Sequence, residues 1–339
     1  MRLIKTEDAV GHVLCHDMTQ IIKDKYKDAR FRKGHVVTEE DIPVLLSMGK
    51  EHLYVWEMTP GMVHENDAAE RLLALCGQEN MIRSGVKEGK IELKAACDGV
   101  FLVDSARLVA VNSQDEVMIA TRKGGMAVRE GDKLAGMRVI PLIIEEEKLR
   151  KAEQAAGDKP LLSLKPYVRK TACIVATGGE VKKGLIKDTF TPVVIDKLKT
   201  YGIETLEVVY SGDGVENVRD AVLAMRERNP DMVLCTGGMS VDPDDNTPGG
   251  IKAAGANIIA YGAPVLPGAM FLLGYFDDGM PVMGLPGCVM YAGATVFDLV
   301  LPKVAADVPV TRADIAAMGE GGLCLGCKPC RYPVCPFGK

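Results

Sequence analysis

The stretch Val233-Leu-Cys-Thr-Gly-Gly-Met-Ser-Val-Asp-Pro-Asp-Asp245 decides the fold of this chain of 339 residues. It consists of an apolar strand, a glycine break and an acidic run, at Met232–Cys235, Thr236-Gly237-Gly238 and Asp242, Asp244 and Asp245. Because glycine has no Cβ, a strand that stops at a glycine pair leaves backbone N–H groups open to a ligand. The stretch therefore predicts a ligand-binding loop directly after a buried strand.

Two further strands end in the same way. The apolar run Ala172–Ala176 leads into Thr177-Gly178-Gly179-Glu180, and Pro281–Leu285 leads into Pro286-Gly287. In open α/β sheets, ligands bind outside the carboxyl ends of the strands. Three glycine-broken strand ends thus predict one binding cleft along the carboxyl edge of a parallel sheet.

From Lys170 onward, strands alternate with helices, which is typical of parallel strands joined by helical crossovers. We expect strands at 172–176, 204–210, 232–235, 258–260, 271–275 and 281–284, and helices at 191–201, 215–228, 251–254 and 289–303. The predicted fold class is α/β, with a three-layer domain around a mostly parallel sheet over residues 170–305. A smaller β-rich domain is expected before it.

The first half of the chain has weaker patterns. Residues 1–57 indicate an α+β segment whose helix follows Thr38. Short strands separated by turn residues predict a β-barrel or sandwich within 58–160, at 90–94, 100–103, 108–111 and 117–121. The charged run Glu145–Lys151 predicts a solvated helix in a linker, and a domain boundary is expected at Gly157-Asp158-Lys159-Pro160.

Composition restricts the class of protein. A formal net charge of −5 and a pI near 5.7 disfavour binding to nucleic acid or to an anionic membrane. No apolar run reaches the roughly 18 residues that span a bilayer, and the first residues lack the apolar stretch of a signal peptide. We therefore expect a cytoplasmic protein, whose scattered cysteines are small core residues and whose histidines, lacking metal-ligand spacing, are ordinary residues.

Five short motifs follow one another in the second half of the chain. They are Ala176-Thr177-Gly178-Gly179-Glu180-Val181, Ser211-Gly212-Asp213-Gly214, Thr236-Gly237-Gly238-Met239-Ser240-Val241, Val265-Leu266-Pro267-Gly268 and Gly284-Leu285-Pro286-Gly287. With these motifs, residues 170–305 resemble the molybdopterin-binding domain of molybdenum-cofactor biosynthesis proteins. That family includes molybdopterin adenylyltransferases and molybdopterin molybdotransferases. Residues 31–55 also look like the molybdotransferase segment before this domain, whereas residues 60–165 do not match the usual arrangement.

The resemblance implies that the ligand is molybdopterin, which carries a phosphate and a flat, polar pterin. The expected cofactor-binding residues are Thr177, Gly178, Gly179, Glu180, Thr236, Gly237, Gly238, Ser240, Pro267, Gly268, Pro286 and Gly287. Glycine loops offer backbone N–H donors to a phosphate, and hydroxyl groups add further donors. The candidate catalytic residues are acids that can hold Mg²⁺, namely Asp213, Asp242, Asp244 and Asp245.

Two departures from the family pattern affect the expected activity. Ala269 stands where molybdotransferases have a lysine suited to an anion, and Cys288 stands where the family has asparagine. Loss of the lysine affects transfer of molybdate more than it affects binding of the pterin. Cys288 is either a buried cysteine or a thiolate stabilised at the start of a helix.

Three functions therefore stay open. The leading one is transfer of molybdate, or of another group, onto bound molybdopterin, as in a molybdotransferase. The second is a non-catalytic carrier that delivers the finished cofactor to a molybdoenzyme. A third is a cofactor-sensing regulator, against which the lack of a basic helix-turn-helix counts. The expected partners are molybdopterin, molybdate and a molybdoenzyme, without nucleic acid or membrane, and the chain is expected to form a homo-oligomer.

The end of the chain carries four of its ten cysteines, Cys324, Cys327, Cys330 and Cys335. Their spacing, Cys-x2-Cys-x2-Cys-x4-Cys-Pro, is one residue longer than that of a bacterial ferredoxin. Four thiolates so close together suit one iron–sulfur cluster or one Zn²⁺, and the alternative is a disordered, reduced tail. The short spacing favours the iron–sulfur cluster, and Gly319–Gly322 predicts a flexible tether before it.

Overall fold

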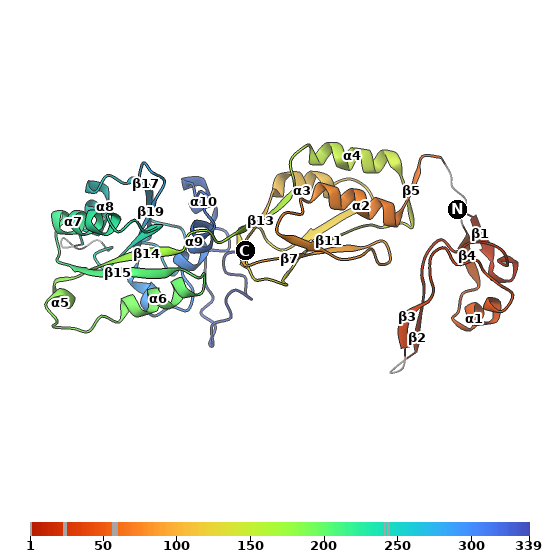
Figure 1. Ribbon diagram of the computed structural model, residues 1–339, viewed down its shortest axis with the longest axis horizontal. Coiled ribbons are helices and arrows are strands. Elements are labelled where there is room, and N and C mark those ends of the chain that lie inside the picture. The colour runs from red at the N-terminus through yellow and green to blue at the C-terminus, as the bar shows by residue number, and fades with distance from the viewer. Residues whose placement is uncertain (1, 23–25, 56–59, 241, 243–244) are drawn as a thin grey trace. The chain divides into compact units, whose positions relative to one another are not determined.

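The computed structural model describes residues 2–22, 26–55, 60–240, 242 and 245–339, and the chain divides into two compact units (Figure 1). The N-terminal unit comprises Met1–Ala96, Val103–Gly124 and Gly131–Ser163. The C-terminal unit comprises Cys97–Leu102, Gly125–Glu130 and Leu164–Lys339. Two short segments from the middle of the sequence thus belong to the C-terminal unit.

The described part of the first 55 residues forms small antiparallel sheets beside one helix. Its elements are β1 (Arg2–Lys5), the 3₁₀ helix η1 (Thr6–Asp8), β2 (Met18–Ile22), β3 (Tyr26–Phe31), α1 (Asp41–Ser47) and β4 (His52–Val55). Strand β1 pairs with β4, and β2 pairs with β3. The Asp41 carboxylate accepts hydrogen bonds from the N–H and the hydroxyl of Thr38, each at 2.9 Å. The helix expected after Thr38 is therefore present, and it begins at Asp41.

The rest of the N-terminal unit combines an antiparallel sheet with helices. Its elements are β5 (Met62–His64), α2 (Glu65–Leu75), β6 (Met81–Arg83), β7 (Ile91–Ala95), α3 (Ser105–Asn112), β9 (Val117–Thr121), β11 (Lys133–Val139), β12 (Ile143–Glu145) and α4 (Glu146–Ala156). The strand order β6-β7-β11-β9 is an open sheet, not a closed barrel. Helix α2 packs against β11 and α4. The region is β-rich, as expected, but it is an α+β structure.

Two expectations for this unit need correction. The strand expected at 108–111 is wrong, because the segment lies in α3. The Asp104 side chain accepts a hydrogen bond from the Arg107 N–H at 3.1 Å, and such an N-cap favours a helix. The charged helix expected around 145–151 is confirmed as α4, but Leu149 and Ala152 are buried. It therefore contributes to the core and is not a solvated linker.

The C-terminal unit contains a six-stranded sheet. Its elements are β8 (Gly99–Val103), β10 (Met126–Val128), β13 (Leu162–Pro166), β14 (Thr171–Thr177), α5 (Gly179–Lys182), α6 (Phe190–Lys199), β15 (Glu204–Ser211), α7 (Val215–Arg226), β16 (Met232–Thr236), α8 (Thr247–Ala253), β17 (Asn257–Tyr261), β18 (Leu272–Tyr275), β19 (Pro281–Leu285), η2 (Gly287–Met290), α9 (Val296–Ala305) and α10 (Arg312–Ala317). The sheet order is β15-β14-β16-β19-β18-β17. Strands β15, β14, β16 and β19 are parallel, and β18 runs antiparallel to both of its neighbours. The expected α/β class is confirmed.

Helices cover both faces of this sheet. Because side chains alternate between the two faces along each strand, every strand contributes to a core on each side. One core contains Ile174 and Leu234 with Phe297 of α9. The other contains Val175 and Val233 with residues of α7 and α8. These two cores make the three layers expected from the sequence. None of the helices in the described ranges is long and apolar enough to cross a membrane.

The helix expected at 289–303 is interrupted. The short 3₁₀ helix η2 ends at Met290, and α9 begins only at Val296. Thr295 and Asp298 form a capping box, in which the Asp298 carboxylate accepts a hydrogen bond from the Thr295 N–H at 2.8 Å. Cys288 therefore does not stand at the start of a long helix.

The flexible tether expected at Gly319–Gly322 is also wrong. The Gly338 N–H donates to the Gly321 carbonyl at 2.9 Å, and the Leu266 N–H donates to the Gly322 carbonyl at 2.8 Å. Phe337 is only 2% exposed and belongs to the same core as α9. The end of the chain, the irregular blue segment beside α9 in Figure 1, is thus packed onto its unit.

Candidate functional site

The three glycine-broken strand ends lie side by side, as expected. In the sheet, Ala176 of β14 is opposite Thr236 of β16, and Thr236 is opposite Leu285 of β19. The loops that follow these strands therefore leave the same edge of the sheet from three adjacent positions. This edge is the carboxyl edge, where α/β sheets bind ligands.

A pocket of about 510 Å³ opens at this edge. It is lined by Gly237, Gly238, Met239, Ser240, Asp245, Ala269, Met270, Pro286, Gly287, Cys288, Met290 and Tyr291. The loops after β16 and β19 make most of the lining. A cavity of about 570 Å³ between α6 and β15 is larger, but it contains none of the glycine loops. A small-molecule site commonly measures roughly 300–1,000 Å³.

Gly237 and Gly238 are required by the loop itself. Both have positive φ angles, +82° and +58°. A Cβ on Gly237 would lie 2.4 Å from the Thr177 carbonyl oxygen, and a Cβ on Gly238 would lie 2.7 Å from the Thr247 hydroxyl. Gly287 differs, because a Cβ there would meet nothing within 4 Å. Of these three pocket glycines, Gly287 leaves room that a ligand can use.

Threonine hydroxyls hold the loops together. Thr177 and Thr236 are buried, and the Thr177 hydroxyl donates to the Thr236 carbonyl at 2.9 Å. The Thr247 hydroxyl donates to the Gly237 carbonyl at 2.8 Å and lies 3.2 Å from the Thr177 hydroxyl. The hydroxyls of Thr177 and Thr247 therefore position the backbone. The sequence did not indicate Thr247, although its place before Pro248 at a helix start was a usable signal.

The remaining predicted binding residues differ in whether they line the pocket. Ser240, Pro286 and Gly287 line the pocket. Gly178 precedes α5, and the Gly179 N–H is already bonded to a carboxylate, that of Asp213, at 3.0 Å. Glu180 lies within α5, and its side chain is outside the described structure. The loop after β14 is thus beside the pocket but not part of its lining.

The predicted acids do not form one group. Asp213 is on the loop after β15, whereas Asp245 lines the pocket and its N–H donates to the Asp242 carbonyl at 2.9 Å. Asp244 lies outside the described residues. Within the described ranges, no group of three or more His, Cys, Asp or Glu side chains is placed to hold a metal ion. The described acids therefore do not assemble the expected magnesium site.

Tyr261 holds part of the pocket lining in place by a hydrogen bond. Its hydroxyl donates to the Met239 carbonyl at 3.0 Å. Burial raises the pKa of this phenol, and the Asp245 carboxylate raises it further. Tyr261 therefore stays a neutral hydrogen-bond donor that fixes the lining segment from Gly238 to Ser240.

Pro267 and Gly268 support the site indirectly. The Val296 N–H, at the start of α9, donates to the Pro267 carbonyl at 3.3 Å. Gly268 has a φ of +128°, and a Cβ there would lie 2.6 Å from the Val296 side chain. The next residues, Ala269 and Met270, line the pocket. The Pro-Gly pair thus positions the lining without belonging to it.

Three residues that follow β19, Cys288, Met290 and Tyr291, form an apolar side of the pocket. Met290 and Tyr291 line it, and the Tyr291 side chain is 77% exposed. Sequence reasoning missed both, although a thioether and an aromatic ring directly after a Pro-Gly loop were a signal. Burial raises the pKa of the Cys288 thiol. This burial favours the neutral thiol over a stabilised thiolate.

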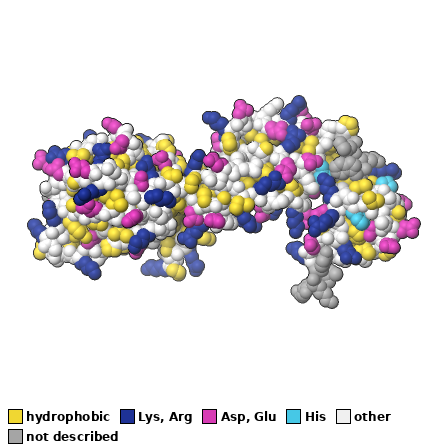
Figure 2. Space-filling view, in the orientation of Figure 1, with side chains coloured by type: hydrophobic (Ala, Val, Ile, Leu, Met, Phe, Trp, Pro, Cys, Tyr) yellow, Lys and Arg dark blue, Asp and Glu magenta, His cyan; other side chains and the backbone are white. Residues whose placement is uncertain are grey.

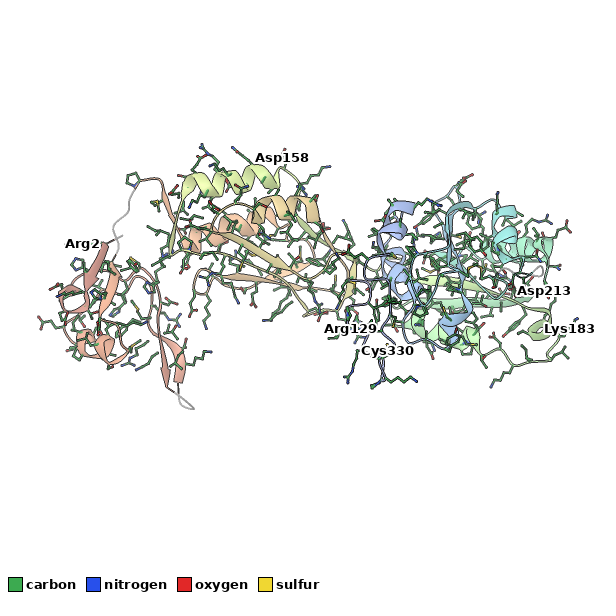
Figure 3. The ribbon with its side chains drawn as sticks, turned by 180° about the vertical axis from the view of Figure 1, so that it is seen from behind. Arg2, Arg129, Asp158, Lys183, Asp213 and Cys330 are labelled. Carbon is green, nitrogen blue, oxygen red and sulfur yellow. The ribbon has the colours of Figure 1, made fainter. Side chains whose placement is uncertain are left out.

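The charges near the site are modest. Asp245 is the charged residue among the lining residues that the structure describes, and Ala269 occupies the place of the expected cation. Figure 2 shows basic and acidic side chains mixed over the visible face of the C-terminal unit. In Figure 3, Asp213 and Lys183 lie at one end of that unit, and Cys330 lies well away from both.

Comparison with known proteins agrees with this geometry. Residues 173–306 match the model of a family described as "Probable molybdopterin binding domain", and residues 3–57 match a domain of unknown function (DUF8806). A CinA-like protein of Mycobacterium tuberculosis is 32% identical over 76 residues, which are 22% of this chain and 18% of that protein. The chain thus spans less than a fifth of the length of that relative.

Two of the solved structures to which this chain is similar are the following. The molybdopterin biosynthesis enzyme MoaB of Thermus thermophilus is 16% identical, with a TM-score of 0.36, over 41% of this chain and 96% of that chain. A molybdenum cofactor biosynthesis protein of Pyrococcus furiosus is 14% identical, with a TM-score of 0.28, over 91% of this chain and 64% of that chain. By its sequence match and its α/β sheet, the segment 173–306 is a domain of the molybdopterin-binding family, and it follows an N-terminal domain of unknown function.

Proposed function

We propose that the chain binds molybdopterin in the pocket at the carboxyl edge of the sheet and acts in molybdenum-cofactor assembly. The observation that carries the proposal is the pocket itself, which the loops after β16 and β19 form within the family domain. Its volume of about 510 Å³ suits a ligand of this size. The flat pterin would lie against Met290 and Tyr291, because thioethers and aromatic rings favour planar π-systems.

The phosphate of the ligand would meet the open backbone at Gly287. This is the glycine of the pocket where an added side chain has no neighbour, so bound ligand is free to approach the chain there. Ser240 would add a hydroxyl donor from the opposite loop. No step is assigned to Mg²⁺, since the described acids do not come together around an ion.

Of the two activities open from the sequence, the lining favours a carrier over a molybdotransferase. A lysine suited to molybdate is replaced by Ala269, and the lining residues that the structure describes hold one acid, Asp245. An anion such as molybdate gains little from such a surface. A neutral pterin ring with its phosphate on backbone N–H groups is less affected.

The binding proposal is tested with Gly287→Val. The new side chain fills the space at the backbone, so affinity for molybdopterin should fall by about tenfold or more. The control is Gly85→Val, because Gly85 also has no neighbour within 4 Å of a Cβ and lies in the N-terminal unit. Affinity is measured by fluorescence titration under anaerobic conditions, and folding by thermal unfolding.

If both variants are folded and bind molybdopterin with equal affinity, this pocket is not the binding site.

The two candidate activities, carrier and molybdotransferase, are distinguished with the unmodified chain. A carrier should retain preformed molybdenum cofactor and release it to a cofactor-free molybdoenzyme. Insertion of molybdate into bound molybdopterin at a catalytic rate would instead establish the transferase.

A further inference from the structure

The Cys-rich tail, residues 319–339, is held on the C-terminal unit at both of its ends. At its start, Leu323 pairs with Leu266, and the Cys324 N–H donates to the Leu266 carbonyl at 2.8 Å. Near its end, the Tyr332 hydroxyl donates to the Asp298 carbonyl at 3.1 Å, and Phe337 is buried in the core. The four cysteines therefore lie on a loop whose two ends are fixed.

The cysteines of this loop fall into two pairs by exposure. Cys324 and Cys335 are half-buried and pack against the core, whereas Cys327 and Cys330 are exposed. The Arg331 N–H donates to the Cys327 sulfur at 3.3 Å. The two exposed cysteines are therefore the ones that a metal ion from solvent can reach first.

Gly326 and Gly293 give the loop its local shape. Gly326, between Cys324 and Cys327, has a φ of +67°, which lets the chain turn back on itself between the first two sulfur atoms. A Cβ on Gly293 would lie 2.8 Å from the sulfur of Cys330. The third cysteine is therefore in direct contact with the segment that follows η2.

The tail thus touches both segments that build one side of the pocket. Leu266, its first contact, is followed closely by the lining residues Ala269 and Met270. Gly293, its second contact, closely follows the lining residue Tyr291. A ligand that orders the loop of cysteines would therefore also restrict the motion of these two segments.

We propose that Cys324, Cys327, Cys330 and Cys335 bind one thiolate-ligated metal centre, which orders this side of the pocket. Among the described residues, which include all four cysteines, no three are grouped to hold a metal, so the loop must close around the ion. Such closure is usual, because binding of a thiophilic metal supplies the free energy that orders a short loop. The metal site stands on the tail alone, and its effect on ligand binding rests on the proposed function.

The test uses the full chain, purified without oxygen, and the double variant Cys327→Ser/Cys330→Ser. The matched control is Cys97→Ser, since Cys97 is a half-buried cysteine outside the tail. The unmodified chain and the control should carry about one equivalent of Zn²⁺, or iron with acid-labile sulfide and broad visible absorption. The double variant should carry neither. Metal-free, colourless protein with four titratable tail thiols would overturn the proposal.

Hydrogen exchange tests the link to the pocket without any pterin. Loss of the metal should increase exchange at residues 263–270 and 287–295, while exchange in β14 and β16 stays unchanged. Unchanged exchange in the two lining segments, in protein that has lost its metal, would overturn the coupling. Because this readout needs no molybdopterin, its failure is distinguishable from failure of the proposed function.

Discussion

At the scale of single residues, Gly237 and Gly287 of the site are glycines for different physical reasons. Gly237 is a glycine because its φ is +82° and the Thr177 carbonyl oxygen leaves no space for a Cβ. Gly287 has no such internal reason. The sequence alone could not separate them, because both follow strands in similar motifs. A substitution at Gly237, which the motif marks as a binding residue, is therefore a poor test of binding.

We expect Gly237→Ala to destabilise the C-terminal unit. The left-handed backbone alone costs about 1–2 kcal/mol in an alanine, and the contact at 2.4 Å adds to it. Gly279→Ala is the control, because Gly279 has the same φ of +82° but no neighbour within 4 Å. Denaturant unfolding should give a clearly larger loss for Gly237→Ala. Equal losses would mean that the loop shifts freely to accept the Cβ.

Asp213 shows what residue patterns left undetermined. Its position after β15 was predicted correctly, but its carboxylate accepts the Gly179 N–H and thereby occupies a donor expected for the ligand. Asp245 does line the pocket. A sequence gives the strand that carries an acid, whereas the rotamer and the local partner depend on neighbours from other elements.

At the scale of elements, capping residues decide where helices begin. Patterns of apolar residues predicted the helix at 289–303, but the Thr295–Asp298 capping box starts α9 later. The same effect made a helix, α3, of the strand expected at 108–111, with Asp104 as N-cap. Both errors come from short segments in which a local polar contact outweighs apolar periodicity.

Helix α2 has an unusual cap that responds to pH. The ring nitrogen Nδ1 of His64 accepts a hydrogen bond from the Asn66 N–H at 3.1 Å, so it must be unprotonated. Burial lowers the pKa of His64 from the ordinary value of 6.5, against an opposing hydrogen bond to the Cys15 carbonyl. The unfolded chain then binds the proton more readily than the folded one. The stabilisation by neutral His64 is therefore lost as the pH falls below 6.5.

We expect His64→Asn to flatten this pH dependence. Asparagine keeps an N-cap acceptor but has no charge to gain. The urea midpoint of the N-terminal unit, followed by circular dichroism, should fall between pH 7.5 and 5.5 in the unmodified chain and change less in the variant. His52→Asn is the control, because His52 is exposed on β4. An identical pH dependence in both variants and the unmodified chain would contradict the assignment to His64.

At the scale of the whole molecule, the sheet was predicted well and the tail was not. Alternating strands and helices specify a parallel sheet by rules that hold across proteins, so β14, β15, β16 and β19 appeared in the expected places. The tail has few apolar residues, and the glycines at its start predict a flexible segment. Two aromatic side chains, Tyr332 and Phe337, pack against the core and, with the backbone hydrogen bonds of Leu266 and Gly321, hold it in place.

Phe337→Ala should therefore destabilise the C-terminal unit. Removing a fully buried phenylalanine costs about 3–5 kcal/mol, through lost burial and the cavity that remains. Val334→Ala is the control in the same tail, since Val334 is 83% exposed and should change stability by less than about 0.5 kcal/mol. Thermal unfolding measures both. If the two variants melt together, the tail is not part of the folded unit.

The membership of the short segments Cys97–Leu102 and Gly125–Glu130 in the C-terminal unit has a consequence for synthesis of the chain. Strands β8 and β10 leave the ribosome well before β13, the neighbour of β8 in their sheet order β10-β8-β13. Until residue 166 emerges, that edge of β8 has no partner. The N-terminal unit itself extends to Ser163, so nearly the same stretch of chain completes that unit and this sheet. A fragment that begins at residue 164 would also lack both strands, so the two units cannot be separated by a single cut.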